Sequence, residues 1–438
     1  MSDIAWMEEL HSFYVGQING QILPFWQKAV DYERGGVFTG YDQMGVTLLH
    51  RDKFTWSQGR FLWLWSRLAD RRRSGLLPLD TEGQDAGTAE LVEARRTYLF
   101  LREHAFLEDG SCAFLLTEEG RQKEMTSGQG HDISIYADCF VAMGFAEYGR
   151  VAGDPEAVRT AERMLAHIEH RLEAGTARTE PYPVPDGCDA HGLAMIMLNA
   201  SQVIAGALES MGGTSSAPNE YRRLAWRYTK QILDTFCDDR DRVREIVRRG
   251  HNAEEDEELL LLRHLNPGHT VESMWFVMEE AVRNDSAETI VKAARILIRA
   301  LTTGWDYEYG GLFRYVDMDG GEPSGKSMPR DDPFERLIRQ TWDTKLWWPH
   351  SEALYACLLA YKLTGDGIHR EWYRRLHRYT FDVFPAAQGK EWLQVRNREG
   401  QPIEKVVALP VKDPYHILRN MLLIVDLISG TCPQDPSQ

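Results

Sequence analysis

Apolar residues recur at every third or fourth position through most of the chain, which is the spacing of a buried helix face. Ile135 and Cys139 show it in one segment, and Leu354 and Leu358 show it in another. The spacing predicts about twelve helices, near residues 4–29, 57–70, 88–105, 135–148, 155–172, 191–210, 218–236, 268–283, 285–303, 348–364, 367–383 and 414–428. Strand-like alternation is rare and is clearest at 405–409. Consecutive pairing of so many helices predicts an all-α (α/α)6 barrel, a closed ring of six helical hairpins; two separate helical bundles are the alternative.

An internal repeat supports the ring. The segment DYERGGVF at 31–38 returns as DYEYGGLF at 306–313, an offset of 275 residues, and a weaker copy begins at Gly389. Adjacent glycines after a helix suit a sharp turn into a short hairpin. We therefore expect short β-hairpins at one end of the barrel, with the active-site opening beside them. Because no long Pro/Gly/Ser-rich linker divides the chain, 1–438 is predicted to be a single catalytic domain with a flexible tail at 430–438.

The charge balance limits the partners of this chain. It carries 50 Lys and Arg against 66 Asp and Glu, a net charge of −16. That balance argues against the nucleic acid backbone and against an anionic membrane surface as partners. An acidic small substrate stays open, because a local cluster of Lys and Arg can override the global sign.

The sequence shows no targeting signal, which favours the cytoplasm. The N-terminal segment MSDIAWMEEL has no basic stretch ahead of an apolar one, and no window approaches 18 apolar residues. The six cysteines are scattered without a C-x-x-C pair, which is typical of reduced thiols. The sequence therefore predicts a cytoplasmic protein without a membrane span.

Cofactor motifs are missing from the sequence. No H-E-x-x-H, Asp-x-Asp calcium loop, G-x-S-x-G, Walker A or G-x-G-x-x-G segment is present. The acidic run at 254–258 is better explained as a solvated loop than as a set of metal ligands. We expect neither a metal nor a cofactor, and a nucleotide effector is left open.

Two histidines stand out from the fourteen by their position. His269 follows the turn Asn-Pro-Gly and shares a helix face with Glu272, three residues later. His416 follows Asp-Pro and shares a face with Arg419 at the same spacing. One such pair is explained by helix capping alone. Two pairs, each at a helix start after a Pro turn, indicate the inward ends of two barrel helices.

Tryptophans gather at the predicted helix starts. The chain has 13 Trp, most of which belong to the core by default. A cavity lined by indoles and a few charged groups also suits a sugar, whose C–H faces stack on aromatic rings. Trp348 with Glu352, and Trp56 with Arg60, open two such helices, and Trp392 lies at the weaker third turn.

These segments resemble the N-acylglucosamine 2-epimerase family, in the family's order from residue 25 to residue 419. The motifs are Phe25-Trp26, Gly35-Gly36-Val-Phe, Trp56-x-Gln-Gly-Arg60, Asn266-Pro-Gly-His269-Thr-Val-Glu272-x-x-Trp275-Phe276, Lys345-Leu-Trp-Trp-Pro-His-Ser-Glu352-Ala and His416-x-x-Arg419. The resemblance implies an (α/α)6 barrel that epimerises or isomerises sugars without a redox cofactor or catalytic metal. The chain departs from the family pattern at 391–396 and 406–414, and carries extra length at 70–90 and 248–264. All four segments are expected to border the sugar pocket.

The resemblance also implies roles. His269 and His416 are the expected catalytic bases, one on each face of the sugar C2 atom, since imidazole with its pKa of about 6.5 can take or give a proton at neutral pH. The expected substrate-binding residues are Arg60, Glu272, Lys345, Trp348, Glu352, Trp392 and Arg419. Among them, Arg60 and Arg419 would hold the developing oxyanion. Glu272 and Glu352 would orient the imidazoles.

The resemblance therefore predicts a 2-epimerase that acts on a reducing aldose or an N-acylhexosamine of the N-acylglucosamine/N-acylmannosamine type. An aldose–ketose isomerase of the mannose/fructose type would use the same site with a single base. A glycoside hydrolase would use Glu272 and Glu352 as two carboxylates flanking the bond, and a binding protein is a further alternative. The partner is a small-molecule sugar, and a homodimer is left open.

Overall fold

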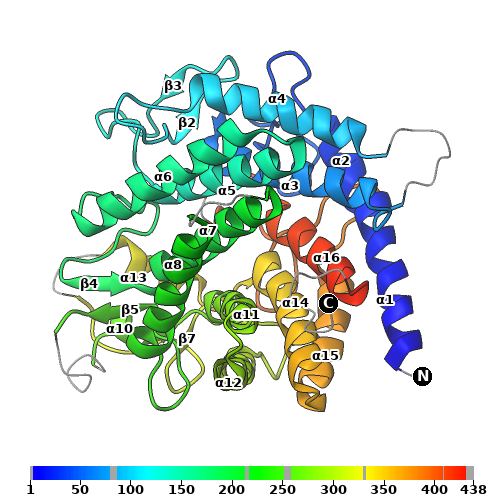
Figure 1. The fold of residues 1–438 in the computed structure, drawn as a ribbon. Coiled ribbons are helices and arrows are strands. Elements are labelled where there is room, and N and C mark those ends of the chain that lie inside the picture. The colour runs from blue at the N-terminus through cyan, green and yellow to red at the C-terminus, as the bar shows by residue number, and fades with distance from the viewer. Residues whose placement is uncertain are drawn as a thin grey trace.

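A ring of helical hairpins forms the body of the protein. The computed structural model describes residues 3–78, 86–212, 217–250, 258–328, 332–407 and 409–430. Among these residues, six inner helices contact one another in sequence order, and the last contacts the first. They are α3 (Thr55–Arg73), α5 (Ile135–Ala152), α7 (His191–Ser210), α11 (Pro267–Arg283), α14 (Trp347–Thr364) and α16 (Tyr415–Ile428). The closed ring confirms the predicted (α/α)6 barrel (Figure 1).

The outer helices cover this ring. They are α1 (Asp3–Gln17), α4 (Thr88–His104), α6 (Pro155–Glu173), α8 (Ala217–Gln231), α12 (Ala287–Gly304) and α15 (Gly367–Val383). The π-helical turn η1 (Ile18–Ile22) continues α1 into α2 (Leu23–Lys28), and η2 (Ile232–Phe236) continues α8. Helix α1 packs beside α16, so the two ends of the described chain meet where the ring closes (Figure 1).

Inner and outer helices differ in how much of their surface is apolar. In α6 the buried residues Ala157, Ala161, Leu165 and Ile168 form one stripe, and Asp154 caps the helix by accepting from two backbone N–H groups. In contrast, the inner helix α7 is long and apolar enough to cross a membrane. However, 78% of its apolar window is buried inside the protein, as in a core helix.

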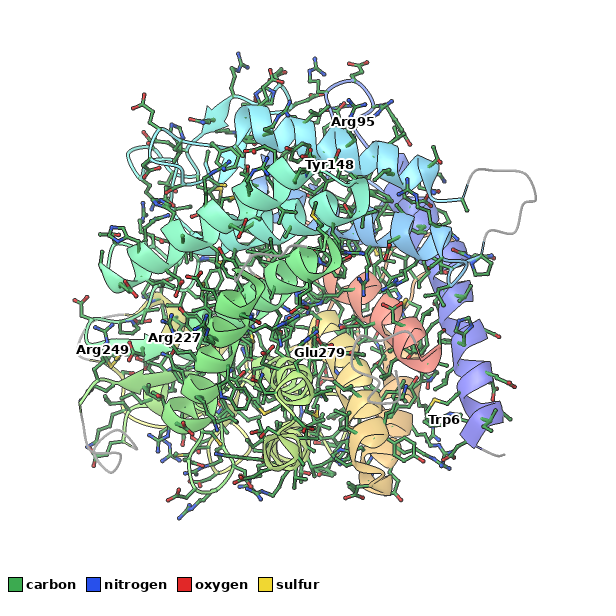
Figure 2. The ribbon with its side chains drawn as sticks, viewed as in Figure 1. Trp6, Arg95, Tyr148, Arg227, Arg249 and Glu279 are labelled. Carbon is green, nitrogen blue, oxygen red and sulfur yellow. The ribbon has the colours of Figure 1, made fainter. Side chains whose placement is uncertain are left out.

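Charged side chains also differ between the outer surface and the interior of the ring. Arg249 lies at the edge of the molecule and Arg227 on the outer helix α8, and both are exposed, whereas Glu279 lies among the inner helices (Figure 2). The buried Glu279 carboxylate accepts a hydrogen bond of 2.8 Å from the Tyr355 hydroxyl. The interior therefore takes up charge only where a polar partner is provided.

Short antiparallel strands lie at one end of the ring, as predicted. One sheet has the strand order β1 (Lys53–Phe54), β2 (Leu115–Leu116) and β3 (Gln122–Lys123). The other pairs are β4 (Cys188–Ala190) with β5 (Ile246–Arg248), β6 (His264–Leu265) with β7 (Val316–Asp317), and β8 (Lys345–Leu346) with β9 (Val395–Arg396). The strands β1, β4, β6 and β8 lead directly into the inner helices α3, α7, α11 and α14. These four strands, each separated from its partner by helices in the sequence, therefore mark the N-terminal ends of four inner helices.

Two local expectations were wrong. The described residues of 405–409 form no strand, because their apolar side chains lie along an irregular segment rather than in a paired sheet. The short helices α10 (Leu260–Arg263) and α13 (Pro333–Thr341) were missed, since each is too short to show a long apolar period.

The repeated turns are built around a buried ion pair. In the first copy the Lys53 Nζ atom lies 2.7 Å from Asp31 Oδ2 and donates to the Gly35 carbonyl. In the second copy the Lys345 Nζ atom lies 2.9 Å from Asp306 Oδ2 and donates to the equivalent glycine carbonyl. Both glycine pairs adopt positive φ angles, which explains why the repeat requires glycine there.

The repeat extends into the following inner helices. Gln58 in α3 binds both the N–H and the carbonyl of Val37, and His350 in α14 accepts from the N–H of Leu312. Counted from Lys53 and Lys345, Gln58 and His350 hold the same position, as do Trp56 and Trp348, and Arg60 and Glu352. The two halves of the ring therefore present tryptophans and charged residues at equivalent places.

We expect Lys345→Met to lower the free energy of unfolding by about 2 kcal/mol, because it removes the buried cation of Asp306 and leaves only the partly exposed Arg398 paired with that carboxylate. The control is Lys326→Met, whose exposed pair with Glu258 contributes less than about 1 kcal/mol. Urea denaturation followed by circular dichroism measures both. Equal stability of the two variants would contradict a structural role for Lys345.

Candidate active site

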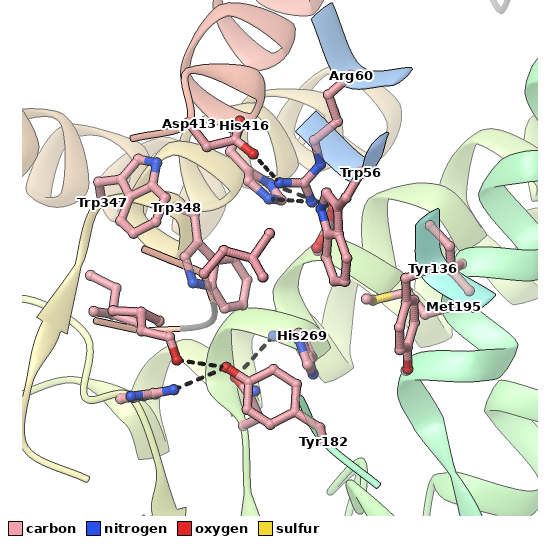
Figure 3. Close-up of a pocket in the computed structure, with 18 of the residues that line it drawn as sticks. Trp56, Arg60, Tyr136, Tyr182, Met195, His269, Trp347, Trp348, Asp413 and His416 are labelled. Atoms are coloured by element: carbon pink, nitrogen blue, oxygen red, sulfur yellow. Dashed lines mark hydrogen bonds and ion pairs between the residues drawn. The ribbon is translucent and has the colours of Figure 1, made fainter. Parts of the chain in front are cut away.

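A cavity of about 180 Å³ opens at the N-terminal ends of the inner helices. All six of these helices line it (Figure 3). Their contributions include Arg60 from α3, Tyr136 and Phe140 from α5, Met195 and Asn199 from α7, His269 and Glu272 from α11, Trp348 from α14, and His416 and Arg419 from α16. The ring thus gathers at one point side chains that are more than 350 residues apart in the sequence.

His416 is held by a buried carboxylate. Its Nδ1 atom lies 2.6 Å from Glu352 Oε1, and because a carboxylate only accepts, Nδ1 carries the proton. Nε2 is then the basic nitrogen, 3.4 Å from Nη2 of Arg60. Burial lowers the pKa of His416 to about 3; Glu272 opposes the shift, and Arg60 and Arg419 add to it. The free site therefore keeps this imidazole neutral.

Glu352 is the centre of a wider buried network. Its Oε1 atom also accepts from Arg419 at 2.6 Å, and its Oε2 atom accepts from the Trp275 indole at 2.7 Å. Arg419 donates to Glu272 as well. Glu352 is fully buried and lies behind His416 rather than in the cavity wall. It therefore positions the imidazole from outside the cavity wall.

His269 has a carboxylate partner of its own. Asn266 caps α11 by accepting from the His269 N–H, with Pro267 in the first turn. The Nδ1 atom of His269 lies 2.7 Å from Glu245 Oε1, so Nε2 is free for a ligand. Burial alone would lower the pKa of His269, but the Glu245 carboxylate outweighs it and raises the pKa. The two site histidines thus have opposite preferences for the proton.

Glu245 is positioned by the pairing of strands β4 and β5. Ala190 pairs with Ile246, and the Glu245 carbonyl accepts from the N–H of His191, at the start of α7. The His191 Nδ1 atom lies 3.7 Å from the other Glu245 carboxylate oxygen. Glu245 therefore faces two imidazoles, and it is a site residue that the sequence analysis missed.

Trp348 connects the two site histidines. Its ring centroid lies 5.3 Å from that of His269 and 5.5 Å from that of His416. The two imidazole centres are therefore at most 10.8 Å apart, the sum of these distances. A small ligand lying on the indole face can thus reach both imidazoles.

Arg60 closes the pocket beside His416. Its Nη1 atom lies 2.5 Å from Asp413 Oδ2, and its guanidinium carbon lies 4.0 Å from the centre of the Phe140 ring. Asp413 also accepts from the N–H of Tyr415, the first residue of α16. The turn that leads into α16 therefore also sets the position of Arg60 (Figure 3).

Besides Glu352, the structure places two more of the expected substrate contacts outside the pocket. Lys345 is fully buried in the ion pair with Asp306, and Trp392 is fully buried against Phe381 and Phe384. Neither residue lines the described cavity. Lys345 lies in β8, which leads into α14, and Trp392 lies in the segment between α15 and β9. Both side chains turn into the protein, where an ion pair and an aromatic cluster receive them.

Of the four segments that depart from the family pattern, two line the cavity and two do not. Gln394, Val407 and Val411 line the cavity, so 391–396 and 406–414 border it as expected. The described residues of 70–90 and 248–264 do not line it. The acidic run at 254–258 lies outside the described residues except for Glu258, and 431–438 of the expected tail lies outside them too.

Two groups of site residues are close enough to hold a cation. His191, Glu245 and His269 form one group, and Glu272, Glu352 and His416 form the other; within each, the ligand atoms lie within 4.8 Å of one another. In both groups a histidine N–H already faces a carboxylate. A cation would have to displace that proton.

Comparison with known proteins shows the family of the chain. The chain matches the family model described as N-acylglucosamine 2-epimerase (GlcNAc 2-epimerase) over residues 36–420. The N-acylglucosamine 2-epimerase of Rattus norvegicus is 28% identical over 437 residues, covering 95% of this chain and 91% of that protein.

Solved structures share the fold. The cellobiose 2-epimerase from Bacillus thermoamylovorans B4167 has a TM-score of 0.72 at 18% identity, covering 96% of this chain and 100% of that one. A D-mannose isomerase has a TM-score of 0.70 at 16% identity, covering 97% and 98%. The fold and the family match place the protein among the carbohydrate epimerases, which are isomerases. The chain belongs to the N-acylglucosamine 2-epimerase family.

Proposed function

We propose that the protein is a sugar 2-epimerase acting on a reducing aldose or an N-acylhexosamine. One observation carries the proposal: His269 and His416 face one cavity across Trp348, and each is held by a separate carboxylate. The names of the curated relatives support a substrate of the N-acylglucosamine type.

The reaction begins from the open-chain sugar. The carbonyl at C1 acidifies the C2–H bond, because the conjugate base is an enediolate. His416 Nε2 removes the proton from one face, and protonated His269 returns a proton to C2 from the other face. Both steps are proton transfers and need no redox cofactor. Each positioned group contributes about 10²–10⁴-fold to the rate.

The raised pKa of His269 and the lowered pKa of His416 suit this division of labour. Two-base epimerisation needs one neutral imidazole and one protonated imidazole at the start of each turnover. Arg60, beside His416 Nε2, is placed to stabilise the enediolate oxygen, where a fixed charge has most effect. Trp348 offers its face to the C–H side of the sugar.

The alternatives fit the site less well. An aldose–ketose isomerase needs one base only, which leaves the second histidine–carboxylate pair without a task. For a glycoside hydrolase, Glu272 and Glu352 would have to flank a glycosidic bond. Instead, both carboxylates bind the same Nη2 atom of Arg419, and Glu352 lies outside the cavity wall.

The reaction class is tested by incubating the protein with a panel of aldoses and N-acylhexosamines in D₂O and following the products by NMR. Deuterium at C2 of a 2-epimer is the expected result. Formation of a ketose would identify an isomerase instead, and release of an aglycone from a glycoside panel would identify a hydrolase.

The alkaline limit of activity depends on Glu245. A raised pKa keeps His269 protonated until the pH passes that value, so donation from His269 is lost as the pH rises. Glu245→Gln removes the charge that outweighs burial, so the pKa of His269 falls and the alkaline limb of kcat/KM should move to lower pH. The pH profile of C2 exchange measures the shift, and an unchanged limb would contradict the assignment of His269 as the acid.

A further inference from the structure

Arg314 is a buried cation in the cavity wall that the proposed mechanism does not use. It follows the second Gly-Gly turn and is 4% exposed. Its Nη1 atom donates to the Thr341 hydroxyl at 3.0 Å, and its Nη2 atom lies 3.3 Å from the Tyr182 hydroxyl. The guanidinium carbon lies 5.0 Å from the centre of the Tyr315 ring. All three neighbours are uncharged.

The other cavity arginines differ from Arg314 in this respect. Arg60 is paired with Asp413, and Arg419 is paired with Glu272 and Glu352. Glu245, the remaining carboxylate of the wall, is bound to His269. Within the described part of the chain, Arg314 has no carboxylate within ion-pair distance.

A buried charge without a partner is costly. Other residues avoid this cost by changing protonation state, but a guanidinium group stays charged at every physiological pH. The cost is recovered when an anion enters and binds the free donors of the guanidinium fork, whose geometry matches carboxylate and phosphate oxygens. Arg314 is therefore placed as the receptor for a negative group.

The position of Arg314 defines which end of a sugar carries that group. The C2 atom must lie between His269 and His416, and Arg60 occupies the side next to His416. Tyr182, which binds Arg314, lies on the far side of His269 from His416 (Figure 3). An anion at Arg314 therefore belongs to the end of the sugar remote from C1 and C2.

We propose that the preferred substrate is an anionic aldose, with a carboxylate, sulfonate or phosphate ester on its terminal carbon bound by Arg314. This inference rests on the proposed function for the reaction that follows binding, but the binding step can be tested separately. The chain is acidic overall, with a net charge of −16, so the unpaired cation is a local feature of this pocket.

Binding is tested with alditols, which have no carbonyl and cannot react. Isothermal titration compares glucitol with three anionic alditols: glucitol 6-phosphate, the alditol of a 6-sulfonated sugar, and gulonate. Gulonate is the reduced form of glucuronate and represents a sugar with a terminal carboxylate. At least one anionic alditol should bind about 10- to 100-fold more tightly than glucitol, and Arg314→Gln should remove that preference. The alditol that binds most tightly identifies the anionic group that the site prefers.

The control is Arg339→Gln in α13, because Arg339 is half-exposed and paired with Glu335 outside the cavity. This variant should keep the preference for the anion. If Arg314→Gln does not fold, the wild-type comparison still decides, and Arg314→Lys should show a weakened preference because it lacks the fork. Equal binding of glucitol and all three anions by the wild type would overturn the proposal.

Turnover separates this inference from the proposed function. The wild type should show a higher kcat/KM for C2 exchange with glucuronate, glucose 6-phosphate or 6-deoxy-6-sulfoglucose than with glucose, and Arg314→Gln should lower that ratio about 10-fold or more. Selective binding of an anionic alditol without any C2 exchange would retain the anion site and reject the epimerase. Exchange on neutral sugars only, without anion selectivity, would reject the anion site and retain the epimerase.

Discussion

His416→Ala and His269→Ala should each lower net epimerisation by about 10²–10⁴-fold, because each removes the base on one face of C2. Neither variant should lose all chemistry. The surviving imidazole can still remove a proton from the epimer whose C2–H faces it and return a deuteron to the same face. Each variant should therefore exchange the C2 proton of one epimer only, and the two variants should act on opposite epimers.

The measurement is C2 deuterium incorporation into each of two epimeric substrates, with the two variants serving as controls for each other. Because both side chains line the same cavity, loss of binding alone would affect both epimers in both variants. Full activity of either variant would remove that histidine from the mechanism. Loss of nearly all activity in one and little in the other would instead indicate a single-base isomerase.

Glu352→Gln should lower kcat by about 10³–10⁴-fold while the protein stays folded. The imidazole of His416 becomes positive when it takes the C2 proton, and the Glu352 carboxylate at Nδ1 stabilises that charge. An amide removes the negative charge, and it offers an acceptor at one end only, whereas Trp275 and His416 donate to the two ends of the carboxylate. The histidine–aspartate pair of serine proteases shows losses of this size, about 10⁴-fold, when its carboxylate is made an amide.

The matched control is Glu279→Gln. Glu279 is also a buried glutamate among the inner helices, and it accepts from the Tyr355 hydroxyl rather than from a site histidine. That variant should keep the wild-type kcat. Equal kcat values for the two variants, with equal thermal stability, would show that Glu352 acts only in packing.

Local sequence patterns were sufficient to predict the helices and the ring. Apolar spacing depends on residues three and four positions apart, which lie on one face of a helix whatever the rest of the chain does. The Pro turn before His269 and the repeated Gly-Gly turns act over a few residues, so the start of α11 and the two Gly-Gly turns could be located. The ring followed because consecutive helices pack as hairpins.

Local sequence patterns did not predict which residues pair with one another in the site. The i,i+3 spacing indicated Glu272 as the partner of His269, but the structure pairs His269 with Glu245, from a loop 24 residues earlier. Glu272 instead binds Arg419, 147 residues away. Spacing along one helix defines which face a side chain occupies, whereas the neighbouring helix or hairpin decides what it meets.

The orientation of charged residues beside a helix start was equally undetermined. Lys345 and Glu352 belong to one motif, yet Lys345 turns into the Asp306 ion pair and Glu352 turns towards His416. Arg314, whose missing partner defines the proposed anion site, had no local signal. The sequence by itself determined the helices, their turns and the general place of the site, because these depend on near neighbours. Only the tertiary structure decided which charges are paired, because that depends on the closure of the ring.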